Sequence, residues 1–248
     1  MQYGICHLSI VPIRANAEES AEMVSQLLYG EHYKVLEQRR QWSKIRVGYD
    51  KCEGWIQNLQ LTFIDETNYK VLTKNNSPEY TIDLVSYVEL DKNNLLPIVL
   101  GSVINKKSMH VHEGNLLSTT QQKSKLINIA LLYLNSPYLW GGKTPFGIDA
   151  SGFTQMVYKI NGYKLLRSAT DQATQGTPLS FIEESETGDL AFFDNNDGVI
   201  DHVGIIMENN YIIHVHGKVR IDRLDHTGIF NTDSKTYSHK LRVIKQII

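Results

Sequence analysis

The sequence predicts an α+β fold in which small β-barrels precede a domain with its helices first and its antiparallel strands last. Three observations support this class. Short strand-like runs and turns fill roughly the first 117 of 248 residues. Two helical patterns follow, around residues 126–134 and 150–160. From about residue 189 onward only strand-like runs remain, and helices followed by antiparallel strands are the α+β order.

Composition sets outer limits on the function. A chain of this length can hold two or three small domains, and its net charge of -2 argues against a nucleic acid or an anionic membrane as partner. No segment approaches the ~20 apolar residues that a membrane span needs. Residues 1–7 lack a basic and then apolar leader, so we expect a cytoplasmic protein, or a periplasmic or secreted one if a signal peptide was removed.

Residues 1–62 are expected to form the first domain. Pro12 interrupts the apolar run at 7–14, which favours an edge strand. Further strand-like runs occupy residues 33–37, 42–47 and 54–57. The order of Gly30-Glu31, Trp42 and Gly54-Trp55 along these strands resembles a bacterial SH3 domain.

Residues 63–117 are expected to form a second domain of strands. The clearest runs are 80–88 and 96–104, with a polar turn cluster at 91–94 between them. Because relatives of the first domain often carry two such modules, we expect a second, divergent SH3-like domain here.

Residues 118–248 are expected to form the third domain. Its two helices show apolar faces at helical spacing, the first made by Leu126, Ile127, Ala130, Leu131 and Leu134, and the second by Phe153, Met156, Val157 and Ile160. The second helix ends at Asn161-Gly162. Strand-like runs then occupy residues 189–193, 202–207, 211–216, 219–221 and 241–247.

The start of the second helix is the most informative position. A loop with Gly141 and Gly142 leads to the turn Asp149-Ala150-Ser151-Gly152. A helix N-terminus has free N–H groups and a partial positive charge, so a thiol placed there would be stabilised as a thiolate nucleophile. The sequence places Ala150 at that position. Neither Cys6 nor Cys52 precedes a helix, so neither replaces the missing thiol, and we interpret both as small, partly buried apolar residues.

A histidine pair is expected on the hairpin that follows. If residues 208–210 form a three-residue loop, Gly204 faces His214, and His202 and His214 project from one face as diagonal neighbours. A two-residue loop would move His202 to the opposite face. In the first register His202 can act as a general base and His214 as the group that orients it. His216 shares that face and is a weaker candidate.

These motifs resemble the NlpC/P60 cell-wall cysteine peptidases, whose pattern Asp-Cys-Ser-Gly corresponds to residues 149–152 and whose His-Val-Gly-Ile strand corresponds to residues 202–205. The resemblance covers the last half of the chain and implies a papain-like domain. It implies a cysteine endopeptidase that needs no cofactor and cleaves the γ-D-glutamyl–diamino acid bond of peptidoglycan stem peptides during muropeptide turnover. The catalytic positions are then Ala150, His202 and His214, with Ala150 removing the activity.

The branch with N-terminal SH3 modules acts on stems with a free N-terminal L-alanine. For this chain the resemblance implies L-Ala-γ-D-Glu-diamino acid as the partner, and we expect a monomer. It implies substrate contacts from Tyr138 near the oxyanion, from Asp149 and Glu31 at the ammonium, and from Ser151 and Ser168 at the D-glutamate carboxylate. Relatives also place a tyrosine beside the Gly-Trp-Ile strand, where this chain has Cys52 and, three residues earlier, Tyr49.

Two alternatives stay open. Ala150 is either a replacement introduced to hold an uncut substrate, or the mark of a natural non-catalytic protein that binds the cell wall. A zinc site of Asp201, His202, His214 and His216 has suitable ligand types. It leaves the Asp-x-Ser-Gly turn without a role, so no metal is expected.

Overall fold

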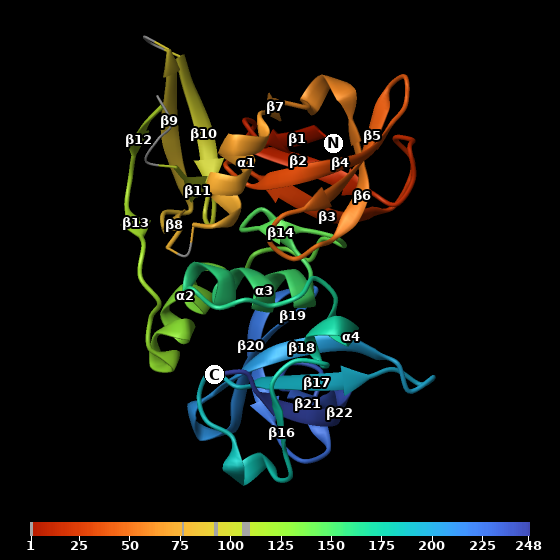
Figure 1. Cartoon of the computed structure of the whole chain (residues 1–248). Coiled ribbons are helices and arrows are strands. Elements are labelled where there is room, and N and C mark those ends of the chain that lie inside the picture. Colours follow the sequence, from red (N-terminus) through yellow and green to blue (C-terminus); the bar gives the residue numbers. More distant parts are fainter. Residues whose placement is uncertain (1, 76, 92–93, 106–109) are drawn as a thin grey trace. The chain divides into compact units, whose positions relative to one another are not determined.

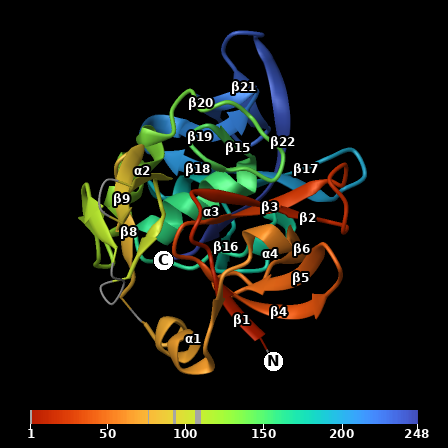
Figure 2. The ribbon, with the colours of Figure 1, turned by 90° about the horizontal axis from the view of Figure 1, so that it is seen from above.

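The computed structural model describes residues 2–75, 77–91, 94–105 and 110–248. The chain divides into two compact units (Figure 1, Figure 2). Unit 1 contains residues 1–120 and 140–145, and unit 2 contains residues 121–139 and 146–248. The finer division at residues 62 and 117 stays a prediction. No helix in the described ranges is both long and apolar enough to cross a membrane.

Unit 1 begins with a seven-stranded antiparallel sheet in the order β3-β2-β6-β5-β4-β1-β7. Its strands are β1 (Gln2–Ile5), β2 (Ile10–Arg14), β3 (Met23–Leu28), β4 (His32–Gln38), β5 (Trp42–Val47), β6 (Glu53–Gln57) and β7 (Phe63–Ile64), with a 3-10 turn η1 (Asn58–Gln60) before β7. Alternate residues point inward, and Val11, Leu27, Tyr33 and Ile45 form a core that excludes water. The predicted strands of the first domain all lie in this sheet, but β2 is not the edge strand that Pro12 indicated, because β2 lies between β3 and β6. Pro12 is tolerated there because β6 pairs with β2 at Arg14, beyond the proline.

The rest of unit 1 holds more turns than the sequence predicts. It contains α1 (Glu66–Thr73), β8 (Glu79–Thr81), β9 (Val85–Asp91), β10 (Asn94–Val99), β11 (Val103–Ile104), β12 (Val111–Glu113), β13 (Leu116–Leu117) and, from the later segment, β14 (Lys143–Thr144). The strands pair as β10-β9-β12 and β11-β8-β13. The predicted run 80–88 is divided between β8 and β9, and the predicted run 96–104 is divided between β10 and β11. The second division falls at Gly101, whose φ is +82°. Helix α1, which was not predicted, starts where the Asp65 carboxylate accepts from the Asn68 N–H.

The α-helices of unit 2 precede all strands of its seven-stranded sheet, as predicted. Its elements are η2 (Lys123–Lys125), α2 (Leu126–Leu132), β15 (Gly147–Ile148), α3 (Ala150–Ile160), α4 (Ala169–Gln172), β16 (Thr177–Leu179), η3 (Ile182–Glu184), β17 (Leu190–Asp194), β18 (Ile200–Met207), η4 (Glu208–Asn210), β19 (Tyr211–His216), β20 (Lys218–Leu224), β21 (Gly228–Asn231) and β22 (Thr236–Gln246). The sheet order is β16-β22-β17-β18-β19-β20-β21, and β22 also pairs with β21. That extra pairing closes six strands into a ring, which satisfies edge groups that would otherwise be unpaired.

Helix α3 is the central helix of unit 2. Every residue from Ala150 to Ile160 is buried, and the helix packs against β18 and β19 (Figure 1). A helix that is covered on all sides is held in place by packing rather than by its intrinsic propensity. Its first residue therefore has a fixed position relative to the strands that carry the histidines.

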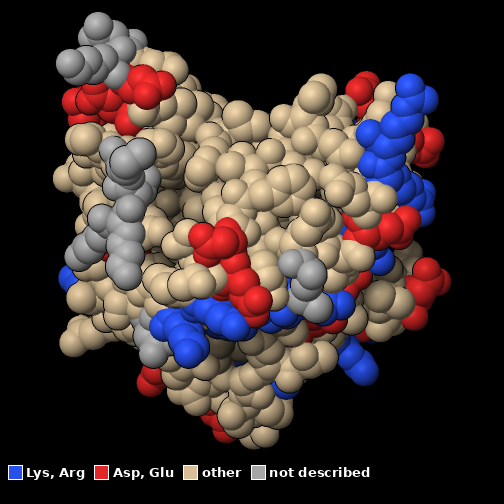
Figure 3. All heavy atoms as spheres, turned by 45° about the horizontal axis from the view of Figure 1, so that its top comes forward, with Lys and Arg blue, Asp and Glu red and all other residues tan. Residues whose placement is uncertain are grey.

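The surface carries charges of both signs. Among the described residues on the face in Figure 3, basic and acidic side chains lie between larger uncharged areas, and neither sign dominates. This distribution agrees with the net charge of -2.

Candidate active site

Residue 150 is the first residue of α3, as predicted. Asp149 has extended backbone, and its carboxylate accepts a hydrogen bond from the Gly152 N–H at 2.6 Å, which fixes the start of the helix. The Ala150 side chain is 7% exposed. The helix N-terminus contributes about half a positive charge at this position, so the local field suits an anion.

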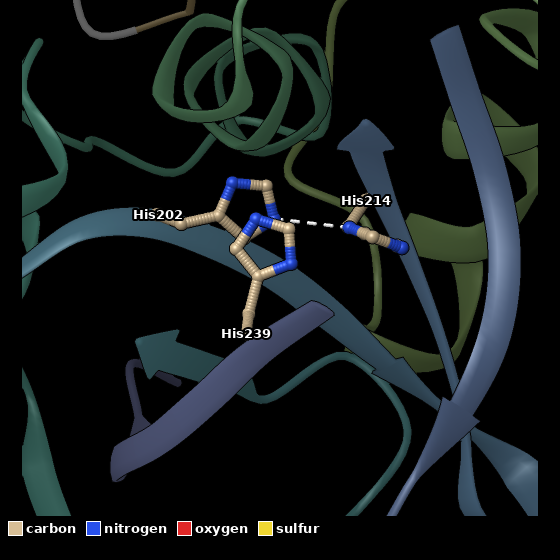
Figure 4. Close-up of side chains that lie close together, drawn as sticks. All are labelled: His202, His214 and His239. Carbon is tan, nitrogen blue, oxygen red and sulfur yellow. Dashed lines mark hydrogen bonds between the residues drawn. The ribbon is translucent and has the colours of Figure 1, made fainter. Parts of the chain in front are cut away.

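The hairpin has the register that makes a histidine pair. Met207 pairs with Tyr211 and Gly204 pairs with His214, so the loop has three residues, as the first of the two registers predicted. His202 Nε2 and His214 Nδ1 lie 3.0 Å apart, and both rings are buried (Figure 4). Gly204 makes room for this contact, because an added Cβ would lie 2.9 Å from the His214 Cβ.

Asp222 extends the pair into a relay. His214 Nε2 lies 3.0 Å from an Asp222 carboxylate oxygen that also accepts from the Arg220 Nε at 2.6 Å. Burial raises the pKa of Asp222, but the hydrogen bonds from His214 and Arg220 outweigh burial and hold it well below its ordinary value. The carboxylate is therefore ionised and can only accept.

This acceptor sets the proton positions along the relay. His214 donates from Nε2 to Asp222, so its Nδ1 carries a lone pair and accepts from the Nε2–H of His202. The remaining His202 nitrogen, Nδ1, then carries the free lone pair and points away from His214 (Figure 4). Burial, followed by the neighbouring histidines, lowers the pKa of His202 well below its ordinary value, so the ring is neutral and able to take a proton.

A third histidine, His239 on β22, also belongs to this cluster. Its ring stacks on that of His202, with centroids 3.8 Å apart and planes 18° from parallel. Burial, followed by His214 and His216, lowers the pKa of His239 to about 3. His216 is exposed but borders the cluster, with its ring centroid 5.1 Å from that of His239 and 6.4 Å from that of His214, whereas Asp201 is simply exposed. The histidine that stacks on the predicted pair is therefore His239. The sequence did not indicate it, because a bulge in β22 determines where its side chain points.

Tyr138 lies next to the turn that carries Asp149. Tyr138 and Ile148 form a parallel bridge, and the Tyr138 side chain is 45% exposed. Partial burial raises the pKa of Tyr138, and the Asp149 carboxylate adds to the shift. The predicted neighbours Tyr138 and Asp149 are therefore brought together.

Arg167 connects two further predicted residues. Its guanidinium contacts the two Asp149 carboxylate oxygens at 2.6 Å and 3.0 Å and the Ser151 hydroxyl at 3.0 Å. The Ser168 hydroxyl caps α4, because it accepts from the Asp171 N–H and donates to the Asp171 carboxylate. Its expected contact with the D-glutamate carboxylate stays a prediction, and the residue before it, Arg167, is the one that contacts Ser151.

Glu31 and Tyr49 have structural contacts inside unit 1. The Glu31 carboxylate is 3% exposed, lies 3.2 Å from the Lys143 Nζ and accepts from the Leu28 N–H, so it is not the open acid that the sequence suggested. Tyr49 is partly buried against the barrel core, and so is Cys52. Burial raises the pKa of the Cys6 thiol to about 12, which agrees with the expectation that Cys6 is not a nucleophile.

Comparison with known proteins gives two domain matches. Residues 135–236 match the NlpC/P60 family, and residues 13–61 match the bacterial dipeptidyl-peptidase SH3 domain. Gamma-D-glutamyl-L-lysine dipeptidyl-peptidase of Bacillus subtilis is 29% identical over 216 residues, which cover 77% of this chain and 71% of that protein. Dipeptidyl-peptidase 6 of Lysinibacillus sphaericus is 24% identical, covering 85% of this chain and 88% of that protein.

Solved structures agree at the level of the fold. The crystal structure of an NlpC/P60 family protein from Bacillus cereus superposes with a TM-score of 0.82 at 19% identity and covers 99% of both chains. An NlpC/P60 endopeptidase from Photobacterium damselae gives a TM-score of 0.70 at 15% identity, over 97% of this chain and 70% of that one. The chain carries an NlpC/P60 domain and, ahead of it, a bacterial SH3 domain.

Proposed function

We propose that this site is that of a cysteine peptidase for peptidoglycan stem peptides, which cleaves the bond between γ-D-glutamate and a diamino acid, and that Ala150 replaces its nucleophile. The observation that carries the proposal is the relay Asp222–His214–His202. Its hydrogen bonds are complete, and its two histidines lie on strands packed against the helix that begins at residue 150. With Ala150 in place, the chain would bind such a peptide without cutting it.

The chemistry follows from the proton positions once a thiol stands at residue 150. His202 Nδ1 takes the thiol proton, and the thiolate attacks the carbonyl carbon of the γ-amide. The N–H of residue 150 and the Tyr138 hydroxyl can donate to the oxyanion. His202 then gives its proton to the leaving amine of the diamino acid, and water, deprotonated by the same nitrogen, releases the dipeptide acid from the thioester. Asp222 keeps His214 in the tautomer that accepts from His202.

The Asp149–Arg167 pair supplies both charges that a free L-Ala-γ-D-Glu end requires. The ammonium of L-alanine can share the Asp149 carboxylate, and the α-carboxylate of D-glutamate can bind Arg167 beside the Ser151 hydroxyl. Arg167 and Asp149 are 10% and 14% exposed, so an unpaired substrate charge there would be costly. A peptide with a blocked amine is therefore expected to bind poorly. The names of the Bacillus relatives favour L-lysine as the first diamino acid to test.

The test is an activity assay on Ala150→Cys with L-Ala-γ-D-Glu-L-Lys. We expect mass spectrometry to detect L-Ala-D-Glu and lysine, and we expect little product from the N-acetylated peptide. The matched control is Ala150→Cys combined with His202→Gln, which keeps the thiol and removes the base. The proposal fails if folded Ala150→Cys releases no dipeptide between neutral and mildly alkaline pH.

Ala150 itself favours a second candidate, a binding protein that recognises the cell wall and does no chemistry. That protein would bind intact sacculi more tightly than the free tripeptide. A pull-down on purified sacculi, set beside a calorimetric titration of the unchanged chain with L-Ala-γ-D-Glu-L-Lys, separates the two. Binding to the tripeptide alone supports the peptidase site, and binding to sacculi alone supports the second candidate.

A further inference from the structure

Three imidazoles meet at one point of unit 2. His202 comes from β18, His214 from β19 and His239 from β22, and one ring nitrogen of each lies within 4.8 Å of the others. Figure 4 shows the His239 ring over that of His202, with His214 facing the edge of both. Three imidazoles are more than the two that a Cys-His-His relay uses.

We propose that His202, His214 and His239 form a binding site for a divalent transition metal ion of the zinc type. Neutral imidazole is a preferred ligand of zinc, copper and nickel. A zinc ion binds imidazole nitrogen at about 2.0–2.1 Å, which puts neighbouring ligand nitrogens of a tetrahedral site about 3.3–3.4 Å apart. The 3.0 Å between His202 Nε2 and His214 Nδ1 is already near that separation.

Two of the three ligands have the outer partners that metal-binding histidines usually have. His214 donates from Nε2 to Asp222, which leaves Nδ1 as the ligand atom and gives a carboxylate–histidine–metal arrangement. His239 Nδ1 lies 2.9 Å from the Ser238 hydroxyl, which leaves Nε2 as the ligand atom. These contacts orient the rings whether or not residue 150 carries a thiol, so the proposal does not depend on the peptidase activity.

His239 is the ligand that must move. His239 is next to a register shift in the pairing of β22 with β21. Ile229 pairs with His239 and Phe230 pairs with Tyr237, so Ser238 is the extra residue of a bulge. Bulges re-aim side chains at strand edges and functional sites. The side chain is only partly buried, whereas His202 and His214 are buried. Turning its Nε2 away from the stacked position toward the other two nitrogens completes three ligands and leaves the fourth position for water.

Metal binding and the proton relay exclude each other. To coordinate through Nε2, His202 must carry its proton on Nδ1, the nitrogen that the relay needs as a base. The hydrogen bond between His202 and His214 is then replaced by two metal–nitrogen bonds. One cluster thus has two alternative states, a proton relay without metal and a closed metal site without a base.

The test is a calorimetric titration of the unchanged chain with Zn²⁺, together with visible absorption of the Co²⁺ form. We expect one ion per chain and the intense absorption of four-coordinate cobalt. His239→Phe keeps a ring stacked on His202 but offers no ligand, and we expect it to lose more affinity than the ~10–100-fold that an outer partner such as Asp222 contributes. The control is His226→Gln, which removes an exposed histidine outside the cluster and should leave binding unchanged.

Histidine ¹⁵N spectra supply a second readout. Zn²⁺ should move the proton of His202 from Nε2 to Nδ1 and shift the His239 Nε2 resonance. The proposal is wrong if the unchanged chain binds no Zn²⁺, if His239→Phe binds it as tightly as the unchanged chain, or if the zinc-bound spectra leave His202 and His239 unaltered. If His239→Phe does not fold, the spectra of the unchanged chain decide.

Discussion

The buried ion pair of Lys143 and Glu31 gives the sharpest prediction for stability. Lys143 is 0% exposed and Glu31 is 3% exposed, and the Lys143 Nζ lies 3.2 Å and 3.3 Å from the two carboxylate oxygens. Lys143→Met keeps the length of the side chain but removes the charge. Glu31 then loses the buried cation that contacts both of its carboxylate oxygens, and breaking a buried pair in this way costs about 3–5 kcal/mol. We expect a loss of that size in the free energy of unfolding of unit 1.

Urea unfolding followed by tryptophan fluorescence measures this loss, because all three tryptophans, Trp42, Trp55 and Trp140, lie in unit 1. With a slope of about 2 kcal/mol per M, the midpoint should fall by roughly 1.5–2.5 M. Adding Glu31→Gln removes the buried negative charge and keeps an acceptor for the Leu28 N–H, so the double variant should recover most of the loss.

The matched control is Lys70→Met, which removes a cation from an exposed pair with Glu66 and should leave the midpoint unchanged. A loss below ~1 kcal/mol for Lys143→Met, or no recovery in the double variant, would show that the Lys143–Glu31 pair does not behave as a buried ion pair.

Three further predictions concern single positions. Gly141 has a φ of +74°, and an added Cβ would lie 2.2 Å from the Met23 carbonyl oxygen. Gly141→Ala should therefore lower the free energy of unfolding, measured in urea, by ~2 kcal/mol or more. Gly198→Ala is the control, because Gly198 has a φ of +75° but open space around it, and its loss should be ~1 kcal/mol. The folded state holds His239 neutral with a pKa of about 3, so the unfolded chain binds more protons below pH ~6.5 and stability falls as pH drops from there toward 3. His239→Phe should reduce the slope of the unfolding free energy against pH by the equivalent of about one proton. If pH-dependent unfolding shows the same slope for both proteins, His239 is not held neutral in the folded state. In the Ala150→Cys background, Asp222→Asn should lower kcat by about 10²-fold with little change in KM, and steady-state kinetics showing the reverse would exclude its role in positioning His214.

The parts of the site that depend on local rules were predictable from the sequence. Asp149 before an apolar helical pattern indicates a cap, and the structure starts α3 at the next residue. The loop at residues 208–210 sets the hairpin register because side chains alternate along both strands, and that register brings His202 to His214.

The parts that depend on long-range pairing were not predictable. His239 is 37 residues beyond His202 in the sequence and reaches it only because β22 pairs with β17 and bulges at Ser238. Asp222 follows the predicted strand-like run at 219–221 and lies inside the longer strand β20. Its spacing of two from Arg220, on the strand after His214, is the signal that was available. Glu31 was read as an open acid because nothing in a turn motif reports a lysine 112 positions later that neutralises it.

The most direct test of the account measures the ionisation of a thiol at residue 150. In Ala150→Cys, the pH dependence of alkylation by iodoacetamide, followed by mass spectrometry of the modified peptide, gives the pKa of that thiol. We expect a value well below the ~8.5 of a free cysteine, because the helix N-terminus stabilises the thiolate and His202 accepts the thiol proton, and we expect the value to rise when His202→Gln is added. A pKa at or above that of a free cysteine, unaffected by His202→Gln, would contradict it.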